Sequence, residues 1–194
     1  MKQKDYLLDT NIIRYIHELE AGSQSSECRK LREKLESLPE NARILLSPVT
    51  AGEVEYGIRV GPFDDPDNEK YKKLVDILTR YPCLSIDCDI ARQYYSLLRA
   101  RLYEKYAPKR KKGQSAGKKR LEEWNDPTTS KELQVQENDL WISAIAWAYN
   151  LKLVTDDAMR PIINVAGDDI EFENCLDKIT TNRHTGASRY PEHF

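Results

Sequence analysis

The stretch YLLDTNIIRYI, residues 6–16, decides the fold. Its first three residues are apolar, and the apolar run stops at Asp9. Apolar residues then recur with helical spacing at Ile12, Ile13 and Ile16. A short apolar run followed directly by an amphipathic helix predicts a buried strand that ends at an acidic side chain.

The same alternation of strand and helix continues along the chain. Further strands are expected at 44–46, 83–86, 151–154 and 170–172, and further helices at about 26–38, 48–61, 69–80, 90–106 and 139–149. The strands are apolar throughout instead of alternating with polar residues, which is typical of parallel sheets covered on both faces. We therefore predict an α/β fold: a three-layer α/β/α sandwich with a mostly parallel central sheet of about five strands.

The chain has 194 residues, of which 40% are apolar, and this suits one domain with a sizeable core. We expect a single domain over residues 1–179. It carries a basic insertion at about 107–135, where Pro, Gly and basic residues interrupt the pattern. Residues 180–194 have no periodicity and are expected to form a disordered tail outside the fold.

Composition also bounds the location and the class of protein. No run of 18 apolar residues exists, so no transmembrane helix is expected, and Asp5 comes too early for a secretory signal. The four cysteines match no zinc spacing and are expected to be reduced thiols in a cytoplasmic protein. The net charge of −2 argues neither for nor against an anionic partner.

Acidic residues interrupt apolar segments at several points. Asp9 closes the first strand, Asp157 with Asp156 beside it closes a later strand, and Asp139 opens an apolar helix. The carboxyl ends of parallel strands share one edge of a sheet, where ligands bind, so these acids are expected to meet there. Glu53, one turn into the helix after the second strand, is a fourth candidate.

Four converging carboxylates repel one another in a low dielectric, and bound Mg²⁺ or Mn²⁺ relieves that repulsion. Carboxylates around such an ion suit hydrolysis of a phosphodiester by a metal-activated water. Taken singly, Asp9 and Asp139 could merely cap helices, and Glu53 could be a solvated helix residue. His17 is read as an ordinary helix residue, so the ordered body lacks the paired imidazoles usual in metal-free RNA cleavage.

Three blocks of sequence resemble PIN-domain ribonucleases, specifically the VapC-like toxins of bacterial and archaeal toxin–antitoxin pairs. The blocks are LLDTNIIRYI (7–16), SPVTAGEVEYG (47–57) and NDLWISAIAWAYNLKLVTDD (138–157). The resemblance implies an endoribonuclease that depends on Mg²⁺ or Mn²⁺, forms a homodimer and is inhibited by a small antitoxin protein. Added loops at about 61–68 and 107–135 depart from the compact family pattern.

The resemblance also assigns roles to residues of this chain. The catalytic residues it implies are Asp9, Glu53, Asp139 and Asp157. The metal ligands would be Asp9, Asp139 and Asp157, with Asp156 as an alternative ligand. The polar neighbours that would orient these acids are Thr10, Asn11, Thr50, Asn138 and Thr155.

The basic segment within the insertion has two readings. It is either an arm that follows the RNA backbone or a solvated loop that adds solubility. It holds seven basic residues and no acid: Lys109, Arg110, Lys111, Lys112, Lys118, Lys119 and Arg120.

Two other functions fit parts of the sequence. A phosphatase with an aspartyl nucleophile would place that nucleophile at Asp9, but Asn11 stands where a second acid would be expected. A non-catalytic PIN-like module that binds nucleic acid or protein has no use for four clustered acids. RNA cleavage is the function that the sequence favours.

Overall fold

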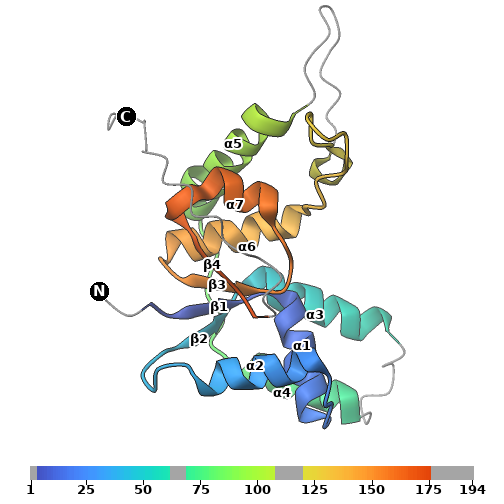
Figure 1. Cartoon of the computed structure of the whole chain (residues 1–194). Coiled ribbons are helices and arrows are strands. Elements are labelled where there is room, and N and C mark those ends of the chain that lie inside the picture. The colour runs from blue at the N-terminus through green and yellow to red at the C-terminus, as the bar shows by residue number, and fades with distance from the viewer. Residues whose placement is uncertain (1–3, 62–68, 108–119, 176–194) are drawn as a thin grey trace, which may run out of the picture.

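The computed structural model describes residues 4–61, 69–107 and 120–175. A parallel sheet of four strands lies at its centre in the order β2-β1-β3-β4 (Figure 1). The strands are β1 (Tyr6–Leu8), β2 (Ile44–Leu46), β3 (Lys152–Thr155) and β4 (Glu171–Asn174). In the register, Leu7 of β1 lies beside Leu45 on one side and Leu153 on the other. The predicted parallel sheet is confirmed.

The strand expected at 83–86 is reduced to a single parallel bridge between Leu46 and Cys83. The N–H of Leu46 donates to the carbonyl of Pro82, and the N–H of Leu84 donates to the carbonyl of Leu46. Residues 85–89 are exposed, Ile86 among them, so no helix layer covers this segment and pairing ends at Leu84.

Helices cover both faces of the sheet, which confirms the three-layer prediction (Figure 1). One layer contains α1 (Thr10–Glu20), α2 (Ser26–Glu36) and α4 (Glu69–Arg80), and α3 (Pro48–Val60) lies beside α1. The other layer contains η1 (Ile90–Tyr95), α5 (Ser96–Tyr106), α6 (Glu137–Ala148) and α7 (Arg160–Ala166). The described residues also form two short 3₁₀ helices, η2 (Leu121–Glu123) and η3 (Gly167–Asp169). Among the described residues, none of these helices has the length and apolar character needed to span a bilayer.

Successive strand residues bury on opposite faces, because side chains alternate along a strand. Leu7 packs with the layer of α5, α6 and α7, whereas Leu8 packs with the layer of α1 and α2. Both side chains are almost fully buried. Two cores therefore flank β1, and the residue that follows it is fixed in position from both sides.

The long helix predicted at 90–106 begins as a π-helical turn, η1. Two adjacent tyrosines of this turn both pack on α6. Tyr94 meets Trp147 edge-on at 5.3 Å, and Tyr95 stacks on Trp141 at 3.9 Å between ring centroids. These aromatic residues therefore pack helix on helix.

Part of the expected basic insertion is a packed segment of the domain. Leu121, Trp124, Leu133 and Val135 are buried in the core that also contains α5 and α6. This half of the insertion has little regular secondary structure beyond η2, yet its widely spaced apolar residues are buried against the folded protein. Residues 108–119, with six of the seven basic residues of the segment, and the tail at 180–194 lie outside the described residues.

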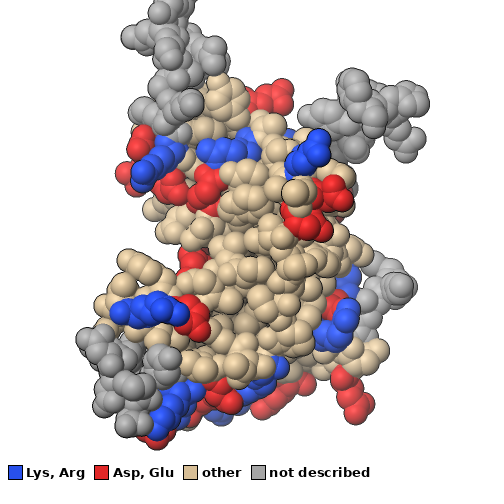
Figure 2. Space-filling model, turned by 180° about the vertical axis from the view of Figure 1, so that it is seen from behind, with Lys and Arg blue, Asp and Glu red and all other residues tan. Residues whose placement is uncertain are grey.

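Charged side chains of both signs are interspersed on the face seen from behind (Figure 2). Lysine and arginine lie next to aspartate and glutamate in the upper and lower parts of this face, and mostly uncharged atoms cover the band between them. On this face, the described residues therefore form no large patch of a single sign.

Candidate functional site

Asp9 lies where β1 ends and α1 begins, at the carboxyl edge of the sheet. Its Oδ1 accepts the backbone N–H of Thr10 at 2.7 Å, so the side chain caps α1. Its Oδ2 accepts the hydroxyl of Thr155, at the end of β3, at 2.6 Å. The residue is only 3% exposed. Asp9 is therefore more than a helix cap, because its second oxygen is held by the neighbouring strand.

Asp139 occupies the first turn of α6 and is partly buried. Its Oδ2 accepts the backbone N–H of Gln136, the residue just before the helix, at 2.7 Å. The capping reading of Asp139 therefore describes a real contact. Capping uses only Oδ2, so it does not account for the other carboxylate oxygen of Asp139.

The pKa values of Asp9 and Asp139 reflect the burial of both side chains and the charges around them. Burial raises the pKa of Asp9 to about 6, and the bonds from Thr155 and Thr10 lower it without offsetting burial. Burial likewise raises the pKa of Asp139 to about 7. Repulsion from the carboxylates of Asp157 and Glu53 raises both pKa values further, and Asp9 acts on Asp139 in the same way. The structure thus brings the four predicted acids close enough to repel one another.

Glu53 reaches this edge from α3 and is held by two other helices. Its Oε1 accepts the side-chain amide of Asn138 at 2.6 Å, and its Oε2 accepts the hydroxyl of Thr10. Residue 138 belongs to α6 and residue 10 to α1, so the carboxylate joins three helix starts. The reading of Glu53 as a solvated helix residue was wrong, because both its oxygens bind protein donors.

The other predicted polar neighbours organise the loops around the acids. The hydroxyl of Thr155, besides donating to Asp9, accepts the N–H of Asp157 at 3.0 Å and the Asn11 amide at 3.4 Å. The buried hydroxyl of Thr50 donates to the Leu8 carbonyl at 3.2 Å, which anchors the start of α3 on the end of β1.

The two adjacent acids after β3 point to different places. Asp157 is exposed and acts on Asp9 and Asp139. Asp156 instead accepts the hydroxyl of Tyr15, in α1, at 2.8 Å. Sequence reasoning missed Tyr15, although it stands four residues after Asn11 and so on the same face of the helix.

The donor set fits a hard divalent cation, since it consists of carboxylate oxygens that repel one another. Within the described ranges, however, no three His, Cys, Asp or Glu side chains converge on one coordination point. The reason is visible in the contacts: oxygens of Asp9, Glu53 and Asp139 are turned toward hydrogen-bond donors.

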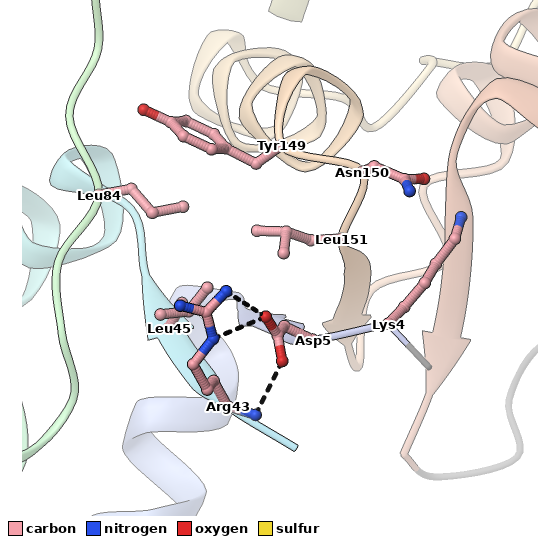
Figure 3. Close-up of a pocket in the computed structure, with 8 residues that line it drawn as sticks. All are labelled: Lys4, Asp5, Arg43, Leu45, Leu84, Tyr149, Asn150 and Leu151. Atoms are coloured by element: carbon pink, nitrogen blue, oxygen red, sulfur yellow. Dashed lines mark hydrogen bonds and ion pairs between the residues drawn. The ribbon is translucent and has the colours of Figure 1, made fainter. Parts of the chain in front are cut away.

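A separate cavity of about 440 Å³ opens at the opposite edge of the sheet (Figure 3). Arg43 and Asp5, which precede β2 and β1, form an ion pair in it, and Tyr149 from the end of α6 lines another wall. None of the predicted site residues lines this cavity. The candidate site is therefore the carboxyl edge, not this cavity.

A family model described as PIN domain matches residues 6–167. The chain belongs to the PIN domain family. This confirms the family that the three sequence blocks predicted. The curated proteins contain no match to the chain.

Several solved structures share the fold of this PIN domain. A chain of VapBC2 from Rickettsia felis, bound to a DNA fragment from the promoter, is 22% identical with a TM-score of 0.55; the match covers 87% of this chain and 97% of that one. A chain of DNA-bound VapBC from Salmonella typhimurium is 19% identical with a TM-score of 0.53, and the match covers 89% of this chain and 99% of that one. A chain of FitAcB from Neisseria gonorrhoeae is 20% identical with a TM-score of 0.54, and the match again covers 89% of this chain and 99% of that one. The structural similarity to VapC proteins of VapBC complexes is thus confirmed at the level of the fold.

Proposed function

We propose that this PIN domain is an endoribonuclease that depends on Mg²⁺ or Mn²⁺ and acts in the cytoplasm as the toxin of a toxin–antitoxin pair. The observation that supports this most is the mutual repulsion of four acids at one sheet edge, which helps to raise the pKa of Asp9 to about 6 and of Asp139 to about 7. Such clusters cost stability, so they are typical of sites that use them. Membership of the PIN family supports the same reaction class.

Each side chain has a role in this proposal. Asp9, Asp139 and Asp157 would hold the cation. When bound, a divalent cation activates water for attack on the scissile phosphate and neutralises the charge that develops there. Glu53, fixed by Asn138 and Thr10, orients the attacking water.

The hydroxyl of Thr155 orients the site as well. It fixes the rotamer of Asp9 and at the same time binds the N–H of Asp157. One hydroxyl group therefore links the side chain of one proposed ligand to the backbone of another, and these two residues follow different strands.

We further propose three partners: RNA as substrate, a small antitoxin protein, and a second copy of the chain. The similarity to chains from VapBC and FitAcB complexes supports a protein partner. The segment from Lys109 to Arg120 is proposed to follow the RNA backbone, and Arg120, the member that the structure describes, is exposed. Neutralising all seven basic residues should then flatten the salt dependence of RNA binding. An unchanged salt slope would identify a solvated loop.

The proposal is tested by incubating the purified protein with mixed RNA, with and without EDTA. RNA fragments that appear only with free Mg²⁺ or Mn²⁺ support it, and the Asp9→Asn variant should give none. Inorganic phosphate released from small phosphoesters would indicate a phosphatase instead. No product from either substrate would indicate a binding module. A reading frame for a small protein directly upstream of the gene would support the toxin role.

A further inference from the structure

The turn after β3 carries two acids whose side chains have different partners. Asp156 accepts the hydroxyl of Tyr15 at 2.8 Å. Tyr15 is itself 7% exposed, and the guanidinium of Arg14 lies 4.7 Å from the centre of its ring. The phenol is therefore a fixed donor, because its ring is held in the core around α1.

The backbone of Asp156 is held from two further directions. Its N–H donates to the side-chain oxygen of Asn11 at 3.2 Å. Its carbonyl accepts the side-chain amide of Asn174, at the end of β4, at 3.3 Å. Asn11 and Tyr15 lie one turn apart on α1, so a single helix face binds both the backbone and the side chain of Asp156. Together these bonds join the turn to α1 and to β4.

Asp157, the next residue, has few constraints of its own. Its N–H donates to the hydroxyl of Thr155 at 3.0 Å, while its side chain is exposed. Repulsion from Asp9 and Asp139 favours a turn that swings this carboxylate away from the sheet edge. Holding the turn in place therefore requires other contacts. Asp156 supplies them through its side chain, its N–H and its carbonyl, each of which makes a hydrogen bond.

We propose that Asp156 is a positioning residue and not a metal ligand: together with Tyr15 it holds the turn that presents Asp157 to the site. This inference rests on the proposed function, since it assigns a task within the same metal site. It predicts that the side chain at position 156 must accept a hydrogen bond from Tyr15 but need not carry a negative charge.

The Asp156→Asn variant separates the two roles. Its amide oxygen still accepts the Tyr15 hydroxyl, but the charge that a ligand needs is gone. A positioning role predicts that this variant keeps its Mn²⁺ affinity, measured by calorimetry, and its cleavage rate within about threefold of wild type. Asp156→Ala and Tyr15→Phe should each lower both by about 10- to 100-fold, with the KM for RNA unchanged.

A double-mutant cycle measured by thermal unfolding in EDTA tests the pair without any activity. Tyr15→Phe and Asp156→Ala should each lower the Tm, and combining them should lower it by clearly less than the sum. Tyr149→Phe is the matched control. It removes a tyrosine hydroxyl bond of 3.1 Å to the Ser85 carbonyl, and its effect should add to that of Asp156→Ala.

The outcomes separate this inference from the proposed function. If the wild type gives no EDTA-sensitive cleavage, the proposed function fails, and the task assigned to Asp156 fails with it. If the wild type cleaves RNA but Asp156→Asn is as inactive as Asp9→Asn, Asp156 is a metal ligand and only the positioning role is overturned. Additive effects of Tyr15→Phe and Asp156→Ala on the Tm would also overturn it.

Discussion

Replacing Asp9 by Asn should stabilise the metal-free protein at neutral pH. The pKa of this carboxyl is raised from 3.8 to about 6, chiefly by burial, which corresponds to a destabilisation of about 3 kcal/mol once the group is ionised. Asparagine keeps an oxygen for the Thr10 N–H, but its amide nitrogen cannot accept the Thr155 hydroxyl. That lost bond costs about 1 kcal/mol. The net gain is about 2 kcal/mol, or roughly 4–8 °C in Tm for a chain of this size.

The gain must depend on pH with a definite sign. Because the folded protein binds a proton at Asp9 more tightly than the unfolded chain does, wild-type stability falls as the pH rises from about 4 to above 6. The advantage of Asp9→Asn should therefore be full at pH 7.5. Near pH 4, Asp9 is protonated in the folded protein and only partly protonated in the unfolded chain, so most of the ionisation penalty is gone. The lost hydrogen bond then offsets the remaining gain, and the variant should be about as stable as wild type or slightly less stable.

The assay is urea or thermal unfolding in EDTA at pH 4.5 and pH 7.5, followed by the same scans with Mn²⁺. Mn²⁺ should raise the Tm of the wild type at pH 7.5 and have much less effect on the variant. Asp5→Asn is the control with the opposite sign. Hydrogen bonds to Arg43 lower the pKa of Asp5, so that substitution should destabilise the protein at pH 7.5. A lower stability of Asp9→Asn at pH 7.5 in EDTA, or a gain independent of pH, would refute the reasoning.

Three further predictions follow from the same site and its surroundings. Protons compete with a cation at Asp9 and Asp139, whose pKa values are about 6 and 7, so Mn²⁺ should bind more tightly at pH 8 than at pH 5.5 by calorimetry; equal affinities would contradict this. Glu53→Gln should lower RNA cleavage by at least about tenfold and the Tm by about 2–4 °C, because glutamine cannot accept from both Asn138 and Thr10 and one lost hydrogen bond costs about 1 kcal/mol. Trp124→Ala should cost about 3–5 kcal/mol in urea unfolding, since the ring is 5% exposed; a loss below 1 kcal/mol would show that residues 120–135 are not part of the core.

The sheet and the location of the acids could be predicted because both follow from local patterns. Apolar strands next to amphipathic helices indicate a parallel sheet, and Asp9 comes directly after such a strand. Parallel strands then place Asp157 at the same edge. Placing Asp9 and Asp157 at one edge of the sheet therefore requires little more than the order of the strands and helices along the chain.

Other features depend on contacts between distant residues. The resemblance favours Asp157 over Asp156 as the ligand, but the contact that distinguishes the two cannot be predicted from the sequence, because Asp156 binds Tyr15, which is 141 residues away. The segment around Trp124 has the composition of a loop, and its burial depends on a surface that exists only after α5 and α6 pack. The expected strand at 83–86 pairs through Cys83 alone, because the residues after it are exposed.

The bond between Asp9 and Thr155 joins positions 146 residues apart. During translation, Asp9 leaves the ribosome long before β3, which carries Thr155. Until β3 is synthesised, β1 can pair only with β2. A nascent chain shorter than about 155 residues therefore holds only part of the constellation. If the site is a nuclease, a ribosome making this protein is exposed to its activity only after β3 and Asp157 have been synthesised and have folded against β1.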